Sequence, residues 1–325
     1  MGGIPEPDGG FVFPERTARM VLRAGIVGVG RMGRTHLQVL ERTERLRVVA
    51  VADPSPEVRA FAERRGLAAY GSISELVATS GIDVAVVASP TSSHHGAVRA
   101  LAEAGIHVLC EKPCGYRAEE AREAGEVAER AGVVLQVGYW KRFVPALLEL
   151  RDRVGRGELG DISLVSCFQW DERPPSAAFR AASGGPAIDM GVHELDLMRW
   201  LTGQDVVALT GHASTVAFGP VIDGDPESVA LVAQLSGGAL GIVSVGRRFV
   251  VGDAHRVQVV GTAGAAEVPY VWPPHEVEDF LGALTAQAEA FADAVEGGPM
   301  TGASASDAAA ALEAAGLVSF VSIGR

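Results

Sequence analysis

Short apolar runs alternate with segments of mixed polarity between residues 22 and 137. The run VAVVA at 84–88 is apolar on both faces, which is typical of parallel strands that helices cover on both sides. The pattern predicts strands at 22–29, 46–52, 83–88, 106–110 and 133–137, and helices at 31–42, 56–65, 74–79, 93–104 and 118–131. Strand–helix alternation of this regularity predicts an α/β fold built on a doubly wound parallel sheet.

The pattern changes after Tyr139. Several strands at short spacing, with glycine-containing turns, occupy 206–268, which is typical of an antiparallel sheet. Around them we expect a strand at 162–170, a loop at 173–186, and helices at 144–154, 189–201, 278–296 and 306–318. This half is predicted to be α+β, with a largely antiparallel open sheet that helices cover on one face. Because the other face needs a partner, we expect a homodimer or homotetramer assembled through this sheet.

The chain of 325 residues is longer than one core usually supports. We expect a flexible extension at 1–20, a Rossmann domain at 21–141 and an α+β substrate and oligomerisation domain at 142–325. The net charge of −12, without any basic run, argues against nucleic acid or an anionic membrane as a partner. No apolar run approaches the roughly 20 residues that span a bilayer, and residues 1–19 lack the apolar core of a signal peptide. A cytoplasmic protein is expected.

A glycine-rich turn follows the first predicted strand, where residues 28–33 read GVGRMG. In a GxGxxG turn that opens a helix, the glycines allow a tight turn and close approach of the backbone to a diphosphate. Asp53 follows about 20 residues later, and a carboxylate there binds ribose hydroxyls and repels a 2′-phosphate. It could equally cap the next helix, since Asp-Pro begins helices well. The turn predicts an NAD site that includes Gly28, Gly30, Arg31, Met32 and Asp53.

Small polar residues follow the strand at 83–88, at the carboxyl edge where such sheets bind ligands. They either line the ribose and nicotinamide or simply cap the next helix. The adjacent His94 and His95 would diverge on a helix, so they are expected to be solvated rather than to bind a metal. Three cysteines are too few for a disulfide framework or a zinc site, and no metal is expected. The cofactor-binding residues predicted here are Ser89, Pro90, Thr91 and His94.

Two further segments carry candidate chemistry. Glu111 and Lys112 directly follow the predicted strand at 106–110, where they would face the nicotinamide. The alternative is that Lys112 is an ordinary surface lysine in a loop. Asp189 and His193 are four residues apart at the start of a helix, so they share a face, and a Gly-rich loop precedes them. A capping aspartate and a half-buried structural histidine would give the same spacing.

The segments GVGRMGRTH, VADPSPE, VVASPTSSHH, VLCEKP, LQVGYWKRFVP and SGGPAIDMGVHELDLMRWLTG cover most of residues 23–201. Together they resemble the family of glucose–fructose oxidoreductase, inositol dehydrogenase and the rhizopine-catabolism proteins. The resemblance implies a catalytic triad of Lys112, Asp189 and His193 and a substrate held between the nicotinamide and the second sheet. His193 would act as the general base and Lys112 would stabilise the reacting oxygen. Asp189 would bind a substrate hydroxyl or hold the imidazole.

Substrate contacts are expected from two aromatic–polar groups, besides Asp189 and His193. Trp140 and Lys141 follow the last Rossmann strand, where inositol dehydrogenases commonly carry Met-Arg, so the exact polyol is left open. Trp170 and Asp171 end the strand at 162–170 and would form a polyol wall, or merely a solvated strand end.

The resemblance implies NAD-dependent oxidation of a ring hydroxyl of a cyclitol, myo-inositol or a relative, to the ketone. An aldose or amino-sugar derivative is the first alternative substrate. An NAD-dependent glycosidase and a non-catalytic NAD-binding sensor are alternatives of other classes, although a sensor would not need the proton-transfer residues.

Overall fold

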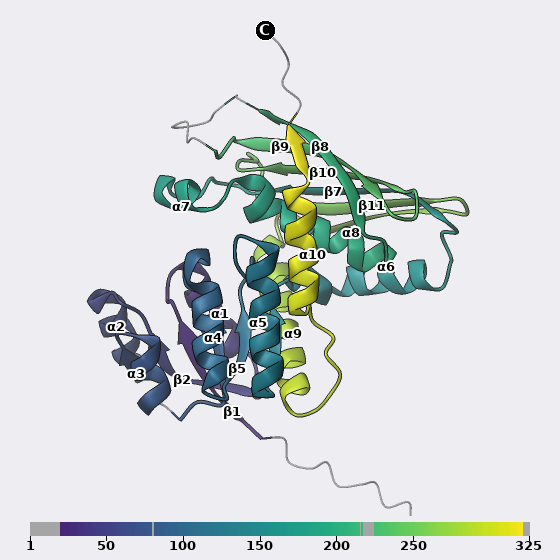
Figure 1. The fold of residues 1–325 in the computed structure, drawn as a ribbon. Coiled ribbons are helices and arrows are strands. Elements are labelled where there is room, and N and C mark those ends of the chain that lie inside the picture. The colour runs from purple at the N-terminus through teal and green to yellow at the C-terminus, as the bar shows by residue number, and fades with distance from the viewer. Residues whose placement is uncertain (1–19, 80, 215, 217–223, 321–325) are drawn as a thin grey trace, which may run out of the picture.

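The computed structural model describes residues 20–79, 81–214, 216 and 224–320. The extension predicted at 1–20 therefore lies outside the described residues, except for Met20. Two β-sheets organise the rest, one in each half of the chain, with helices between and beside them (Figure 1).

The first sheet has six strands paired in parallel, in the order β3-β2-β1-β4-β5-β6. Every residue of β4 is buried, so both faces of the sheet are covered, as its apolar sequence predicts. The strand order reverses between β1 and β4, where doubly wound sheets bind ligands. The elements of this half are β1 (Leu22–Val27), α1 (Arg31–Leu40), β2 (Leu46–Ala52), α2 (Pro56–Glu63), β3 (Ala68–Tyr70), α3 (Ile73–Thr79), β4 (Val84–Val87), η1 (Thr91–Ser93), α4 (His94–Glu103), β5 (His107–Cys110), α5 (Ala118–Ala131) and β6 (Leu135–Val137).

The second sheet has seven strands in the order β12-β11-β7-β10-β9-β8-β13. Most pairs are antiparallel, as predicted, but β10 pairs with β7 and β13 with β8 in parallel. The elements of this half are η2 (Trp140–Phe143), α6 (Pro145–Gly155), β7 (Ile162–Trp170), α7 (Ala177–Ala182), η3 (Ala187–Gly191), α8 (Val192–Thr202), β8 (Val206–Ser214), β9 (Ser228–Leu235), β10 (Leu240–Gly246), β11 (Ala254–Gly261), β12 (Ala265–Val271), α9 (Glu276–Val295), α10 (Ala305–Gly316) and β13 (Val318–Phe320).

Side chains of the second sheet alternate between a covered inner face and an open outer face. Figure 1 shows α6, α8 and α10 on the side of this sheet that faces the first half. On the outer face, Val232 and Leu240 are each 50% exposed and Ile242 is 38% exposed. The covered side is therefore the side on which the two halves meet.

Helix α10 joins the two halves, because it packs against α5 of the first and α8 of the second. Buried Arg142 adds a polar connection to this junction. Its Nη2 lies 2.5 Å from Asp196 Oδ1 in α8, and its Nη1 donates to Asp307 Oδ2 in α10 at 3.3 Å. A guanidinium held by two carboxylates fixes the relative position of these helices.

Four local features differ from the sequence-based expectations. The short strand β3 was not predicted, since three residues carry too little periodicity to be recognised. Helix α7 lies within the predicted loop at 173–186, where the Ser176 hydroxyl caps the Phe179 amide. The helix expected at 189–201 begins with the π-helical turn η3. The last helix ends at Gly316, and β13 occupies the residues predicted to close it.

No helix among the described residues is long and apolar enough to cross a membrane. The same residues contain no cluster of His, Cys, Asp or Glu side chains that could hold a metal ion.

Two glycines allow close packing at the end of β1, Gly28 against the loop after β4 and Gly33 against the turn that opens α1. Gly28 has a φ of +84°, and a Cβ there would lie 2.6 Å from the backbone of Ser89. A Cβ on Gly33 would lie 2.0 Å from the carbonyl oxygen of Gly28, so α1 cannot approach β1 this closely with any larger residue. Gly30, between them, has no other protein atom within 4 Å of such a Cβ.

We expect Gly33→Ala to lower the free energy of unfolding by about 1 to 3 kcal/mol, because the added methyl group meets backbone that cannot move aside. Gly30→Ala is the matched control and should unfold close to the parent, since the methyl group enters open space at a negative φ of −72°. Thermal unfolding of the ligand-free variants makes the comparison. Equal stability of Gly33→Ala and the parent would contradict the packing argument.

Candidate active site

The turn at residues 28–33 forms a cradle for an anion at the start of α1. Gly30 is the N-cap residue of α1 and has no side chain that could accept a hydrogen bond from the first amide groups of the helix. Open space borders Gly30, where a side chain would fill it. Unpaired helix-start amides beside a side-chain-free surface fit the diphosphate of a dinucleotide.

Asp53 supports this turn. Its Oδ2 accepts a hydrogen bond from the Val29 amide and its Oδ1 accepts one from the Ser55 amide, both at 2.9 Å. Each carboxylate oxygen has a further lone pair, and the side chain is only half-buried. Ser55 is the N-cap residue of α2, so the alternative expectation that Asp53 caps this helix was wrong. Asp53 braces the turn and can still accept hydrogen bonds from ribose hydroxyls.

The loop after β4 is held by side-chain hydrogen bonds rather than left free. Ser89 Oγ lies 2.6 Å from Ser93 Oγ, and Pro90 and Thr91 follow at the start of η1. His94 was expected to be solvated, but it is 1% exposed. Its ring nitrogens lie 2.7 Å from the Ser89 carbonyl oxygen and 2.8 Å from that of Pro113. The expectation of a solvated histidine was wrong, because a short loop turns its ring inward to join the loops after β4 and β5.

Glu111 is buried at the end of β5, and its carboxylate is engaged with His36 of α1 at 2.7 Å. Burial alone would raise the pKa of Glu111, but His36 and Lys112 outweigh it and lower this pKa. Sequence analysis placed Glu111 beside the cofactor and did not identify His36 as its partner. The pair connects the helix that begins at the glycine turn to the strand that carries Lys112.

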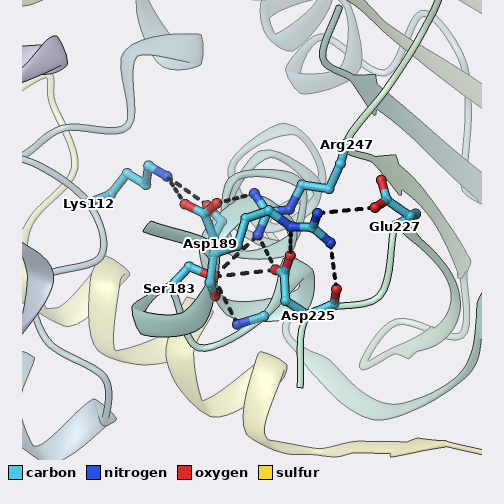
Figure 2. Close-up of polar contacts among 8 residues, drawn as sticks. Lys112, Ser183, Asp189, Asp225, Glu227 and Arg247 are labelled. Atoms are coloured by element: carbon cyan, nitrogen blue, oxygen red, sulfur yellow. Dashed lines mark hydrogen bonds and ion pairs between the residues drawn. The ribbon is translucent and has the colours of Figure 1, made fainter. Parts of the chain in front are cut away.

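Lys112 and Asp189 meet across the junction of the two halves (Figure 2). Lys112 follows β5, and Asp189 lies in η3. The Lys112 ammonium donates to the Asp189 backbone oxygen at 2.6 Å and to its Oδ1 at 3.2 Å. Both side chains are partly exposed, at 17% and 12%, so they can border a bound molecule.

His193 lies in the first turn of α8 and is 5% exposed. Its ring contacts the rings of Tyr139 and Trp140 edge-on, with centroids 5.7 and 6.2 Å apart. Its Nδ1 is buried without a hydrogen-bond partner among the described residues. Burial, reinforced by the charges of Lys112 and Lys141, lowers the pKa of His193 well below 6.5. The imidazole is therefore neutral at neutral pH, and a neutral imidazole can accept a proton.

Asp189 has a second cationic partner that the sequence analysis missed. The Nη1 of Arg247, directly after β10, lies 2.5 Å from Asp189 Oδ2. Burial alone would raise the pKa of Asp189, but Lys112 and Arg247 outweigh it and lower this pKa. The only local signal was a pair of arginines after an apolar strand, in the sequence SVGRRF.

Trp140 and Lys141, expected to contact substrate, are both buried. The Lys141 ammonium donates to Gln169 Oε1 at 2.9 Å and pairs with Glu194 of α8. Trp140 packs edge-on against Phe280 of α9, with ring centroids 5.0 Å apart. Trp140 packs against the His193 ring in the protein interior, and the charge of Lys141 lowers the pKa of the imidazole.

Trp170 and Asp171 lie differently from each other. Trp170 shares the outer face of the second sheet with Phe168, on which it stacks, and donates to Ser244 Oγ at 3.0 Å. Gln169, on the opposite face, contacts Lys141 near His193. Successive side chains of a strand alternate between faces, so Trp170 and Gln169 point to opposite sides of the sheet. Contrary to the expectation, the structure therefore does not bring Trp170 to the His193 side.

Asp171 follows directly after β7 and is half-buried. Burial, together with the carboxylates of Asp253 and Asp189, raises its pKa to about 6. The Asp189 carboxylate is near enough to act on Asp171 through its charge, whereas a contact between Asp171 and substrate stays a prediction.

Comparisons with known proteins agree with this geometry. Residues 22–139 match the NAD-binding Rossmann fold of an oxidoreductase family, and residues 147–267 match the Gfo/Idh/MocA C-terminal domain. The chain is 48% identical to the rhizopine catabolism protein MocA of Rhizobium meliloti, over 89% of this chain and 92% of that protein. It is 31% identical to the inositol 2-dehydrogenase of the same species, over 85% and 87%.

A solved structure has the same fold. The scyllo-inositol dehydrogenase from Lactobacillus casei, with bound NAD(H) and scyllo-inositol, superposes with a TM-score of 0.82 at 25% identity. The match covers 92% of this chain and 96% of that one. The chain therefore belongs to the Gfo/Idh/MocA family and is an NAD-dependent dehydrogenase.

Proposed function

We propose that this enzyme oxidises a ring hydroxyl of a cyclitol, myo-inositol or a close relative, to the ketone. The observation that carries the proposal is the contact between the Lys112 ammonium and the Asp189 carboxylate at the junction of the two sheets, with the neutral imidazole of His193 near enough to respond to the Lys112 charge. Secondary alcohol oxidation needs a base for the hydroxyl proton and a cation for the developing oxyanion. Lys112, Asp189 and His193 supply both.

NAD supplies the acceptor for the hydrogen and electron pair that leave the carbinol carbon. In our proposal the amide groups at the start of α1 bind its diphosphate and Asp53 binds the ribose hydroxyls. Ser89, Pro90 and Thr91 border the same edge of the sheet. Glu111 and His94 act indirectly, because their polar atoms hold the loops that carry these groups.

The proton moves to His193. Because Nδ1 is buried, Nε2 is the nitrogen that accepts the hydroxyl proton. Lys112 donates a hydrogen bond to the same oxygen and stabilises the negative charge that develops on it. Asp189 keeps the ammonium charged and aimed at the substrate oxygen. The Rossmann domain at 21–141 then supplies the lysine, and the domain at 142–325 supplies the carboxylate and the imidazole.

An aldose or amino-sugar derivative is the second candidate substrate, and Asp171 favours an amino group. Burial and repulsion by the carboxylates of Asp253 and Asp189 raise the pKa of Asp171 to about 6. A substrate ammonium beside Asp171 would relieve that repulsion.

We also propose that a second copy of this chain covers the outer face of the second sheet. Val232, Leu240 and Ile242 are exposed there on two adjacent paired strands. Leu164 of β7 pairs with Leu240 and continues the apolar surface on the neighbouring strand. An apolar face of this extent on both copies suits a two-fold interface.

The substrate proposal is tested by mixing the purified protein with NAD+ and a panel of inositols, amino-inositols and hexoses, while NADH absorbance is followed. We expect NADH formation with an inositol and, in the same assay, at least a tenfold smaller rate (about 1.4 kcal/mol in the barrier) with hexoses. If only hexoses reduce the cofactor, the cyclitol assignment fails. Hydrolysis of a chromogenic glycoside without net NADH would point to a glycosidase instead.

The control for this assay is Lys112→Ala. We expect it to lower kcat by about 100-fold or more, because the oxyanion loses its cation, while NADH affinity stays within about threefold. Unchanged turnover in this variant would remove Lys112 from the proposed site.

The acidic limb of the pH profile reports His193. Because its pKa lies well below 6.5, we expect kcat/KM to stay level from neutral pH to below pH 6.5 and to fall as the imidazole is protonated. The measurement is kcat/KM against pH, with circular dichroism to show that the fold persists. Asp171→Asn separates the nearby titration of Asp171. A limb centred above 6.5 in that variant would contradict a buried neutral base.

The assembly is tested by light scattering. We expect the parent to have at least twice the mass of one chain, and Ile242→Lys to shift it toward the monomer, because a lysine cannot be buried unpaired in an apolar interface. Arg256→Lys, in β11 of the same sheet, keeps its charge and serves as the control. A monomeric parent would contradict the proposal.

A further inference from the structure

A cluster of buried ion pairs extends from Asp189 into the second half of the chain (Figure 2). Arg247, at its centre, is 0% exposed. Its Nη1 lies 2.5 Å from Asp189 Oδ2, and its Nη2 lies 2.5 Å from Asp225 Oδ1 and 3.3 Å from Ser183 Oγ. One guanidinium thus joins the partly exposed carboxylate of Asp189 to the almost fully buried carboxylate of Asp225.

Arg180 lies on the far side of Asp225. Its Nε is 2.5 Å from Asp225 Oδ2, and its Nη1 is 3.1 Å from Glu227 Oε1. With Lys112, the two arginines bring three positive charges against the three negative charges of Asp189, Asp225 and Glu227. Pairing of this kind is what makes burial of so many charges tolerable.

We propose that Arg247 is a positioning residue for the dehydrogenase reaction, holding the Asp189 carboxylate in the orientation and charge state that Lys112 requires. The inference rests on the proposed roles of Lys112 and Asp189. Arg247 is too deeply buried to touch a substrate, so it acts through Asp189.

The geometry of the fork supports this role. Arg247 takes Oδ2 of Asp189 and leaves Oδ1 to the ammonium of Lys112, so the carboxylate cannot rotate without losing one partner. Arg247 is itself fixed by Asp225 and by its backbone amide, which donates to the Glu227 carbonyl oxygen at 2.7 Å. A planar guanidinium can serve two carboxylates at fixed angles, whereas a lysine ammonium is a flexible point charge.

The charges around Asp189 determine what loss of Arg247 does. Lys112 faces Asp189 from the loop after β5, Arg247 from the end of β10, and Asp171 from the end of β7, while His193 lies one turn further along the chain. Without Arg247, burial opposes ionisation of Asp189, and Lys112 is the remaining cation that favours it. The Asp189 pKa then rises. We expect it to pass the lowered pKa of His193, so that the acidic limb, which reports His193 in the parent, reports the loss of ionised Asp189 at a higher pH in the variant.

The alternative is that the cluster only stabilises the fold. Arg180 tests this, because it belongs to the same cluster and pairs with the same Asp225. Within the described part of the chain, Arg180 forms no hydrogen bond or ion pair with Asp189. A purely structural cluster would respond alike to loss of either arginine, whereas a positioning role belongs to Arg247 alone.

The experiment compares Arg247→Met, Arg247→Lys and Arg180→Met in the full-length enzyme, with kcat and kcat/KM measured against pH in the direction of NAD+ reduction. We expect Arg247→Met to lower kcat about tenfold or more and to move the acidic limb upward by about one pH unit. Arg247→Lys should keep the limb near its parent position, since the charge remains, but lose part of kcat. Arg180→Met should lower the melting temperature and leave the limb where it is.

Two further measurements keep the outcomes apart. NADH affinity should stay within about threefold in every variant, because none of these residues lies in the cofactor turn. If Arg247→Met does not fold, the double variant Arg247→Met/Asp225→Asn takes its place in the experiment. The double variant removes one buried charge of each sign. A parent-like limb in the Arg247 variant, or an equal shift in Arg180→Met, would overturn the inference.

Asp189→Asn distinguishes failure of the inference from failure of the proposed function. Full activity in Asp189→Asn would refute the proposed site itself. Loss of activity there, together with a parent-like pH limb in Arg247→Met, would refute only the role of Arg247. In the Asp189→Asn background, removal of Arg247 should shift the limb no further, because the two residues act as a unit.

Discussion

The contact between Lys112 and Asp189 is the interaction on which the site depends, because each half of the chain contributes one partner. Lys112 lies in the loop after β5 of the parallel sheet, and Asp189 lies in the turn that precedes α8. Their meeting requires the halves to be docked in one orientation, which α10 provides by packing on both α5 and α8. Buried Arg142 reinforces that junction through Asp196 and Asp307. In our proposal, this docking encloses the reacting alcohol between the cofactor turn and the second sheet.

Electrostatics around this contact follows from burial. Low dielectric surroundings penalise every unpaired charge, so the cations and carboxylates behind Asp189 occur in matched pairs. The same burial removes the charge from His193, whose neighbours Lys112 and Lys141 are themselves cationic. A charged carboxylate and a neutral imidazole one helical turn apart are thus consequences of one environment acting on different local charges.

The cofactor half and the substrate half differ in how their polar groups are used. In the first half, the side chains of Asp53, Glu111 and His94 form hydrogen bonds with backbone groups or with other segments. These hydrogen bonds hold the cofactor turn rigid. In the second half, Asp171 is left among carboxylates, with a pKa raised to about 6. The polar groups around the cofactor turn are thus paired, whereas the surroundings of the Asp171 carboxylate disfavour its ionisation.

Local sequence determined the parallel sheet, the glycine turn, the NAD cofactor and the segments that contain Lys112, Asp189 and His193. Periodicity and short motifs are local properties, so they can be read without knowing the fold. The inward ring of His94, the outward indole of Trp170 and the partnership of Arg247 with Asp189 were decided only by tertiary structure. Each depends on which face of a strand or loop meets a segment far away in the chain, 58 positions away for Arg247 and Asp189. Burial also set the His193 pKa far from the ordinary value assumed from the residue type, because desolvation is a property of the packed interior.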